Sequence, residues 1–101
     1  MLIHYIISLN QNPLAMINGY KEGDEMKEVF SDYLYDPVHC VGVLIPAVIK
    51  VLCDNIFKEY NDVIWKERQG FRSLSVGDRI TFDELSIPIV IHITNDGYER
   101  T

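Results

Sequence analysis

The chain has 101 residues, of which 48% are hydrophobic and 24% charged, and 15 acidic against 9 basic side chains give a net charge of −6. A chain of this length fits one domain with a modest core, and its composition excludes a disordered or low-complexity protein. The negative charge excludes a generally basic nucleic-acid binder, although a local basic segment is compatible with it.

The N-terminal segment predicts a strand. Residues 2–9 are dense in isoleucine, leucine and tyrosine, and they stop at the breaker Asn12-Pro13. Such a continuous apolar run indicates a strand that is buried on both faces or nearly so. A second short apolar stretch, residues 14–17, is closed by Asn18-Gly19, a dipeptide typical of turns.

Residues 20–36 allow two interpretations. Apolar side chains from Met26 to Tyr33 recur at helical spacing, and Asp24 can cap a helix that starts there. Val29-Phe30 and the aromatic residues near position 35 favour a strand instead. Helix and strand remain equal alternatives for this segment.

Residues 45–60 predict an amphipathic helix. Pro46 suits the first helical turn, and apolar residues recur at steps of three and four up to Tyr60. Cys53 falls on the apolar side and is expected to be a buried thiol. We expect Asn61-Asp62 to end the helix, and residues 61–72 to form a connection that contains Trp65 and closes near Gly70.

The C-terminal third predicts a hairpin. Residues 79–82 and 87–94 have strand character, with Pro88 at the start of the second strand and residues 83–86 as the loop. Residues 95–97 form a final turn. We therefore expect a single α+β domain over residues 1–101, in which one long helix packs on a small, mostly antiparallel sheet. The other sheet face then needs cover, which predicts a homodimer.

Residues 72–78, Arg-Ser-Leu-Ser-Val-Gly-Asp, are the most distinctive run. Leu74 and Val76 can enter the core while the two serines face outward, Gly77 permits a positive φ, and Asp78 can accept hydrogen bonds from nearby backbone N–H groups. The run is either a structural turn that sets the register of the last hairpin or a functional segment.

The motif also carries a resemblance. Gly23-Asp24, Val29-Phe30, Phe57 with Asn61, the run from Arg68 to Asp78, and Gly97-Tyr98 follow one another in this order. This order resembles a group of small proteins from phages, plasmids and bacterial genomes, in which R-S-L-S-V-G-D precedes a strand pair and a closing Gly-Trp. YodL-like proteins look like more distant relatives. The resemblance covers residues 20–98 and implies a mobile-element or accessory protein, without implying an activity.

The sequence gives little support for a metal site or a catalytic site. The soft ligands are His4, His39, His92, Cys40 and Cys53, and none of their spacings matches a zinc site. Cys40 with His39 or His92 is the only cysteine–histidine option for a nucleophile, and the sequence has no phosphate-binding loop or nucleophile elbow. We expect a non-enzymatic protein without cofactor or metal.

Residues 65–79 form a locally basic segment. Between positions 66 and 79 there are four basic side chains against two acidic ones, and aromatic residues interleave with them. Aromatic rings can stack on bases while arginines contact phosphate, so this segment is the alternative nucleic-acid site. Its candidate binding residues are Trp65, Arg68, Phe71, Arg72, Ser73, Ser75, Asp78 and Arg79. In the structural interpretation, the arginines pair with the acidic 22–36 segment.

An acidic face is the second candidate surface. Its members are Glu22, Asp24, Glu25, Glu28, Asp32 and Asp36. Such a face can engage a basic partner surface. The favoured interpretation is a small, acidic, non-catalytic protein-binding module, and an acidic inhibitor of a host nuclease is a further alternative. No apolar run is long enough for a membrane span, so we expect a soluble, cytoplasmic protein.

Overall fold

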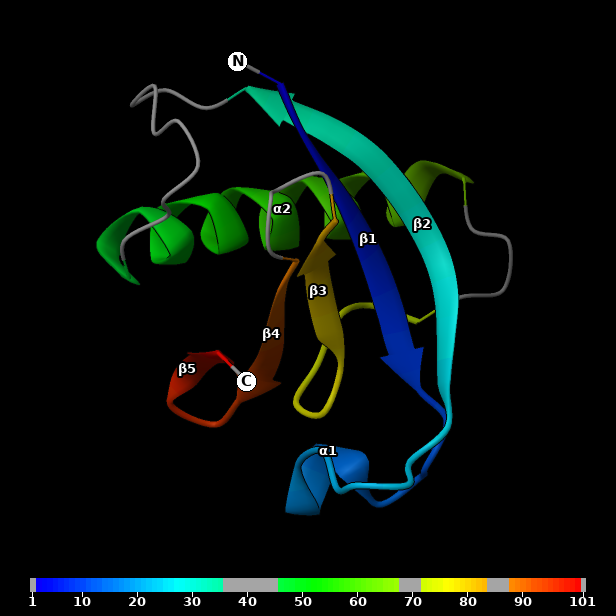
Figure 1. Cartoon of the computed structure of the whole chain (residues 1–101). Helices are drawn as coiled ribbons and strands as arrows, with labels where there is room; N and C mark the ends of the chain where they lie inside the picture. Colours follow the sequence, from blue (N-terminus) through cyan, green and yellow to red (C-terminus); the bar gives the residue numbers. More distant parts are fainter. Residues whose placement is uncertain (1, 36–45, 68–71, 84–87, 101) are drawn as a thin grey trace.

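The computed structural model describes residues 2–35, 46–67, 72–83 and 88–100 (Figure 1). Within them, five strands form one antiparallel sheet in the order β2-β1-β3-β4-β5. The elements are β1 (Leu2–Asn10), α1 (Ala15–Asn18), β2 (Met26–Tyr35), α2 (Pro46–Glu67), β3 (Arg79–Phe82), β4 (Ile89–Thr94) and β5 (Gly97–Arg100). The predicted α+β fold is confirmed. No helix in the described ranges is long and apolar enough to cross a membrane.

The core lies between α2 and one face of the sheet. Leu52, Cys53, Ile56 and Tyr60 of the helix are fully or almost fully buried against the odd-numbered residues of β1 and their partners on β3 and β4. The prediction of a buried Cys53 thiol is confirmed, and burial raises the pKa of this thiol to about 12.

β1 is the central strand of this arrangement. Leu2 is exposed, the side chains from Ile3 to Ile7 alternate between buried and half-buried, and Ser8, Leu9 and Asn10 are all buried. The predicted strand is confirmed, but burial on both faces holds only for its C-terminal end. The connection over residues 11–25, which includes α1, lies at this end of the sheet (Figure 1), and its Tyr20 stacks on His92 of β4.

The ambiguous segment is a strand. β2 pairs with β1 from Leu2↔Tyr35 to Asn10↔Met26, with a register shift between Ile7 and Ser8. The strand interpretation prevails because β1 offers a long free edge and because valine and the aromatic residues fit a pleated surface. Asp24 lies in the turn before β2 and caps no helix.

The main helix is longer than predicted. It continues past Asn61-Asp62 to Glu67, so the expected connection over residues 61–72 is wrong in its first part. Asparagine and aspartate cost a helix only about 0.7 kcal/mol each, and no glycine or proline follows before position 67. Gly70, the expected end of the connection, lies outside the described residues.

The C-terminal hairpin is confirmed, and a further strand follows it. β3 and β4 pair from Arg79↔His92 to Phe82↔Ile89, whereas residues 84–87 of their loop lie outside the described residues. The turn after Thr94 leads into β5, which the sequence analysis did not anticipate because it has four residues and only one large apolar side chain.

Candidate functional site

The geometry of the distinctive run 72–78 centres on one ion pair between Arg72 and Asp78. Arg72 Nη1 and Nη2 donate to the two carboxylate oxygens of Asp78 at 2.6 Å each, and Asp78 is fully buried. The backbone N–H groups of Asn10 and Ser75 donate to the same carboxylate at 2.8 Å. The predicted acceptor role of Asp78 is therefore seen, with a bidentate guanidinium as the additional partner.

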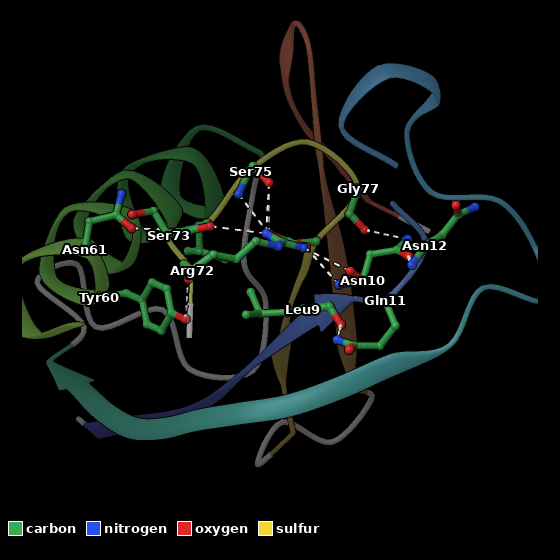
Figure 2. Close-up of polar contacts among 12 residues, drawn as sticks. Leu9, Asn10, Gln11, Asn12, Tyr60, Asn61, Arg72, Ser73, Ser75 and Gly77 are labelled. Atoms are coloured by element: carbon green, nitrogen blue, oxygen red, sulfur yellow. Dashed lines mark hydrogen bonds and ion pairs between the residues drawn. The ribbon is translucent and has the colours of Figure 1, made fainter. Parts of the chain in front are cut away.

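Arg72 also joins separate parts of the chain. Its guanidinium donates to the Asn10 carbonyl at 3.0 Å and to Ser75 Oγ at 2.9 Å (Figure 2). The hydrogen bonds with Asp78 raise the pKa of Arg72 above its already high value. Arg72 thus pairs with an acid of its own loop rather than with the acidic 22–36 segment, and its charge is largely compensated.

The C-terminal half of α2 holds the other side of this loop. Tyr60 Oη donates to the Arg72 carbonyl at 3.0 Å, and the Leu74 N–H donates to Asn61 Oδ1 at 3.2 Å (Figure 2). Leu74 is buried as predicted, but Val76 is only half-buried, and Ser75 faces the ion pair instead of solvent. Ser73 is exposed as expected.

Hydrogen bonds continue from the ion pair to α1. Asn10 Nδ2 donates to Asp24 Oδ2 at 2.9 Å and to the Gly77 carbonyl at 3.2 Å. Asn12 Nδ2 donates to the other oxygen of Asp24 at 3.1 Å, and Asn12 Oδ1 accepts the Leu14 N–H at 3.0 Å. The bond from Asn10 is the main reason why the pKa of Asp24 is lowered.

Gly77 and Ala15 are in close contact and fix the position of α1. Gly77 has a φ of 94°, which favours glycine, and an added Cβ would lie 2.7 Å from the Ala15 Cβ. Ala15 itself is buried. The run 72–78 is thus a frame that orients the short helix as well as the last hairpin.

The framed helix presents its apolar side chains to solvent. Leu14, Met16 and Ile17 are 54%, 59% and 73% exposed, although they lie within four consecutive positions. We call these three residues the α1 apolar surface. Isolated exposed apolar side chains are common, but a contiguous group on an ordered element marks an interaction site more often than chance exposure.

A pocket of about 320 Å³ adjoins this surface and shares Ile17 with it. Its lining residues include Asn18, Tyr20, His92, Asp96 and Glu99, and we call it the His92 pocket. His92 is 8% exposed, and its ring stacks on Tyr20, with 4.2 Å between the ring centroids. Burial lowers the pKa of His92, the positive charge of Arg79 lowers it further, and the negative charge of Glu99 opposes this shift.

One atom of this histidine lacks a partner. Among the described residues, His92 Nε2 is buried and has no hydrogen-bond partner, and the same is true of Nε of Arg79, which pairs with His92 across β3 and β4. Buried polar atoms without partners are rare in folded proteins, and each needs an explanation such as a ligand or a function.

A second hollow lies between α2 and β5. It has a volume of about 610 Å³, and Lys50, Asp54, Phe57 and Tyr98 contribute to its lining. Tyr98 Oη donates to Asp54 at 2.7 Å and Lys50 donates to the same carboxylate at 2.9 Å. The bond between Tyr98 and Asp54 ties the last strand to the helix.

The structure brings together only some of the candidate binding residues of the 65–79 segment. Arg72, Ser75 and Asp78 form the ion-pair network, and Arg79 lies half-buried on the other side of β3. Trp65 belongs to α2, but its side chain lies outside the described residues, as do Arg68 and Phe71. The aromatic part of the nucleic-acid hypothesis therefore stays a prediction.

The predicted acidic face is divided. Asp32 lies opposite Tyr5 on the α2 side of the sheet, whereas Glu28 lies opposite Ser8 on the other side. Asp24 is engaged by Asn10 and Asn12, Glu22 and Glu25 are exposed near the turn before β2, and Asp36 lies outside the described residues. The described members do not share one surface, because a bulged strand turns its charges to both faces of the sheet.

The α1 apolar surface and the His92 pocket were not predicted from the sequence. Residues 14–17 were identified as an apolar stretch, but nothing in their pattern distinguishes an exposed helix of four residues from a buried segment. The pocket joins Tyr20 to β4 and β5, which are distant in sequence. No group of three metal-ligating side chains occurs in the described part of the chain. Comparisons with protein-family models, curated proteins and solved structures gave no match.

Proposed function

We propose that this chain is a non-catalytic protein-binding module that contacts its partner through the α1 apolar surface. The observation that supports this most is the exposure of Leu14, the residue before α1, and of Met16 and Ile17 within this helix of four residues. Exposing such side chains loses roughly 1.5 to 3 kcal/mol each relative to burial. A partner that covers them recovers much of this free energy.

The frame beneath the surface supports the same function. A helix of four residues is unstable by itself, so its position depends on the contacts of Asn10, Asn12 and Gly77. Because these contacts order the helix before a partner arrives, binding loses less conformational entropy than the ordering of a loose loop would require. Preorganisation of this kind is typical of binding surfaces.

Charge indicates what kind of protein the partner is. Asp96 and Glu99 are exposed on the rim beside the α1 apolar surface, and the whole chain carries a net charge of −6. A partner with basic residues around an apolar patch complements this surface and is attracted to it over a distance. The resemblance of residues 72–78 to mobile-element proteins supports an accessory role in such a setting.

A paired-variant capture experiment tests the proposal. The chain is immobilised and exposed to an extract of its source cells, alongside the variant Leu14→Gln/Met16→Gln. The matched control is Leu2→Gln/Val51→Gln, which removes two side chains of similar exposure elsewhere, at 58% and 51%. We expect the α1 variant to bind the captured protein about tenfold or more weakly, because central apolar anchors are each worth more than 1 kcal/mol.

Equal loss in both variants would overturn the proposal, because binding would then follow general hydrophobicity rather than this surface. Retention of the partner by the α1 variant would also overturn it. Capture of RNA or DNA in place of a protein would instead favour the alternative function of the basic segment.

A further inference from the structure

We infer that the His92 pocket receives an arginine side chain of the partner protein. This inference rests on the proposed function and names the group that the partner inserts beside the α1 apolar surface. Ile17 belongs both to that surface and to the pocket lining, so a partner lying across α1 reaches the pocket directly.

The lining of the pocket favours a cationic, donor-rich group. Asp96 and Glu99 bring carboxylates to the lining, Asn18 and Asn95 bring amide groups that include an acceptor oxygen, and the described lining contains no lysine or arginine. A guanidinium group carries five N–H donors and no acceptor, which complements such a set. The acidic charge of the whole chain favours the same ligand.

His92 contributes an aromatic ring to the lining. The residue is more than nine-tenths buried and stacks on Tyr20, and its Nε2 has no hydrogen-bond partner among the described residues. Burial lowers the pKa of His92 and so favours the neutral ring, which does not repel a cation as an imidazolium would. Asp96, Glu99 and Arg79 are the charged groups that face this ring or line the pocket beside it.

The apolar part of the lining favours an arginine side chain over a lysine side chain. Ile17, Tyr20 and Val76 offer surface for the methylene groups of a long side chain. A guanidinium is more weakly hydrated than an ammonium and stacks on aromatic rings, so it tolerates a half-enclosed pocket better. The volume of about 320 Å³ is at the lower end of small-ligand sites, which suits one side chain.

Titration with single amino-acid probes tests the inference on the whole chain. N-acetyl-arginine methylamide is added while amide resonances are followed by two-dimensional NMR. N-acetyl-citrulline methylamide, which has the same shape without the charge, and N-acetyl-lysine methylamide serve as matched probes. We expect saturable shifts at Tyr20, His92 and Glu99, with a dissociation constant on the order of millimolar for so small a ligand. Binding of citrulline should be at least about fivefold weaker.

Two variants locate the effect. Glu99→Gln should weaken arginine binding about three- to fivefold, because it removes one of the two carboxylates of the pocket. Glu59→Gln, which removes an exposed acid from α2, should leave it unchanged. Equal binding of arginine and citrulline, equal binding of arginine and lysine, shifts outside the pocket, or an unaltered Glu99→Gln variant would each overturn the inference.

The outcome is separable from that of the proposed function. If arginine fails to bind while Leu14→Gln/Met16→Gln still loses the protein partner, the inference fails and the binding module stands. If arginine binds in the pocket while the α1 variant retains its partner, the proposed function fails, and so does the assignment of the arginine to that partner.

Discussion

Asp78 is fully buried, and its carboxylate accepts two hydrogen bonds from Arg72, two from backbone N–H groups and a longer one from Ser75 Oγ. Removal of Arg72 leaves this carboxylate buried without its cation, and breaking such a pair destabilises a protein by about 3 kcal/mol or more. We therefore expect Arg72→Ala to lower the free energy of unfolding in urea by about 3 kcal/mol. Lys50→Ala, which breaks an exposed pair with Asp54, should lower it by less than about 1 kcal/mol.

The opposite result would mean that residues 72–78 do not have a structural role. If Arg72→Ala were as mild as Lys50→Ala, the ion pair would not hold the loop. The residues of the 72–78 run would then be free for a functional role of their own.

Gly77 offers a second test at the scale of a residue. Alanine at this position would be strained by the φ of 94°, and its Cβ would meet Ala15 at 2.7 Å. Gly23 has the same φ of 94° but nothing within 4 Å, so Gly23→Ala isolates the strain alone. We expect Gly77→Ala to lose about 2 kcal/mol or more in thermal unfolding, and Gly23→Ala about 1 kcal/mol. Equal losses of stability in the two variants would show that Ala15 of α1 does not pack closely against Gly77.

The residue types in this run predicted part of its structure. The positive φ of Gly77 and the acceptor role of Asp78 follow from local chemistry, and both are observed. The partnership with Arg72 does not follow, because the two residues meet only after the loop has folded against Asn10. Side-chain pairing of this kind is decided by tertiary structure rather than by sequence spacing.

At the scale of elements, Asp54 connects α2 to β5 and makes their contact sensitive to pH. Hydrogen bonds from Lys50 and then Tyr98 lower the pKa of Asp54 below its usual value of 3.8. A carboxylate with a lowered pKa in the folded state stabilises the fold above its unfolded pKa. This contribution is lost as the pH falls through the folded pKa.

Unfolding experiments across this range test the link. We expect the wild type to be more stable than Asp54→Asn at pH 7, and the difference to shrink as the pH falls below about 4. Asp62→Asn, another exposed aspartate of α2, controls for the general removal of a surface charge. A difference that grows toward acid would contradict the contact.

Elements differ in how far their sequences determine them. The sequence pattern of β1, β3 and β4 was sufficient to predict these strands, because each strand has an apolar side that faces α2. The C-terminal end of α2 could not be predicted from the sequence. The Asn61 side chain accepts a hydrogen bond from the loop after the helix, while the Asn61 backbone remains helical. β2 could be predicted only if its partner strand was known. α1 is too short for its apolar residues to show a helical period.

At the scale of the whole molecule, the described residues cover only part of one sheet face. The connection 11–25 covers its end near Asn10, while Leu2 and Tyr33 remain 58% and 51% exposed at the other end. The homodimer expected from the sequence would use this open half. Because each copy carries a charge of −6, we expect sedimentation to show stronger association at high salt, where repulsion is screened. A constant single-chain mass at every concentration and salt would refute the dimer.

The central claim is that α1 and the His92 pocket together form the working surface. Hydrogen exchange of the chain, alone and with its captured protein partner, tests this most directly. The account predicts that protection upon binding falls on residues 14–20 and 92–99. Protection confined to β2 or to the run 72–79, with residues 14–20 exchanging as in the free chain, would contradict it.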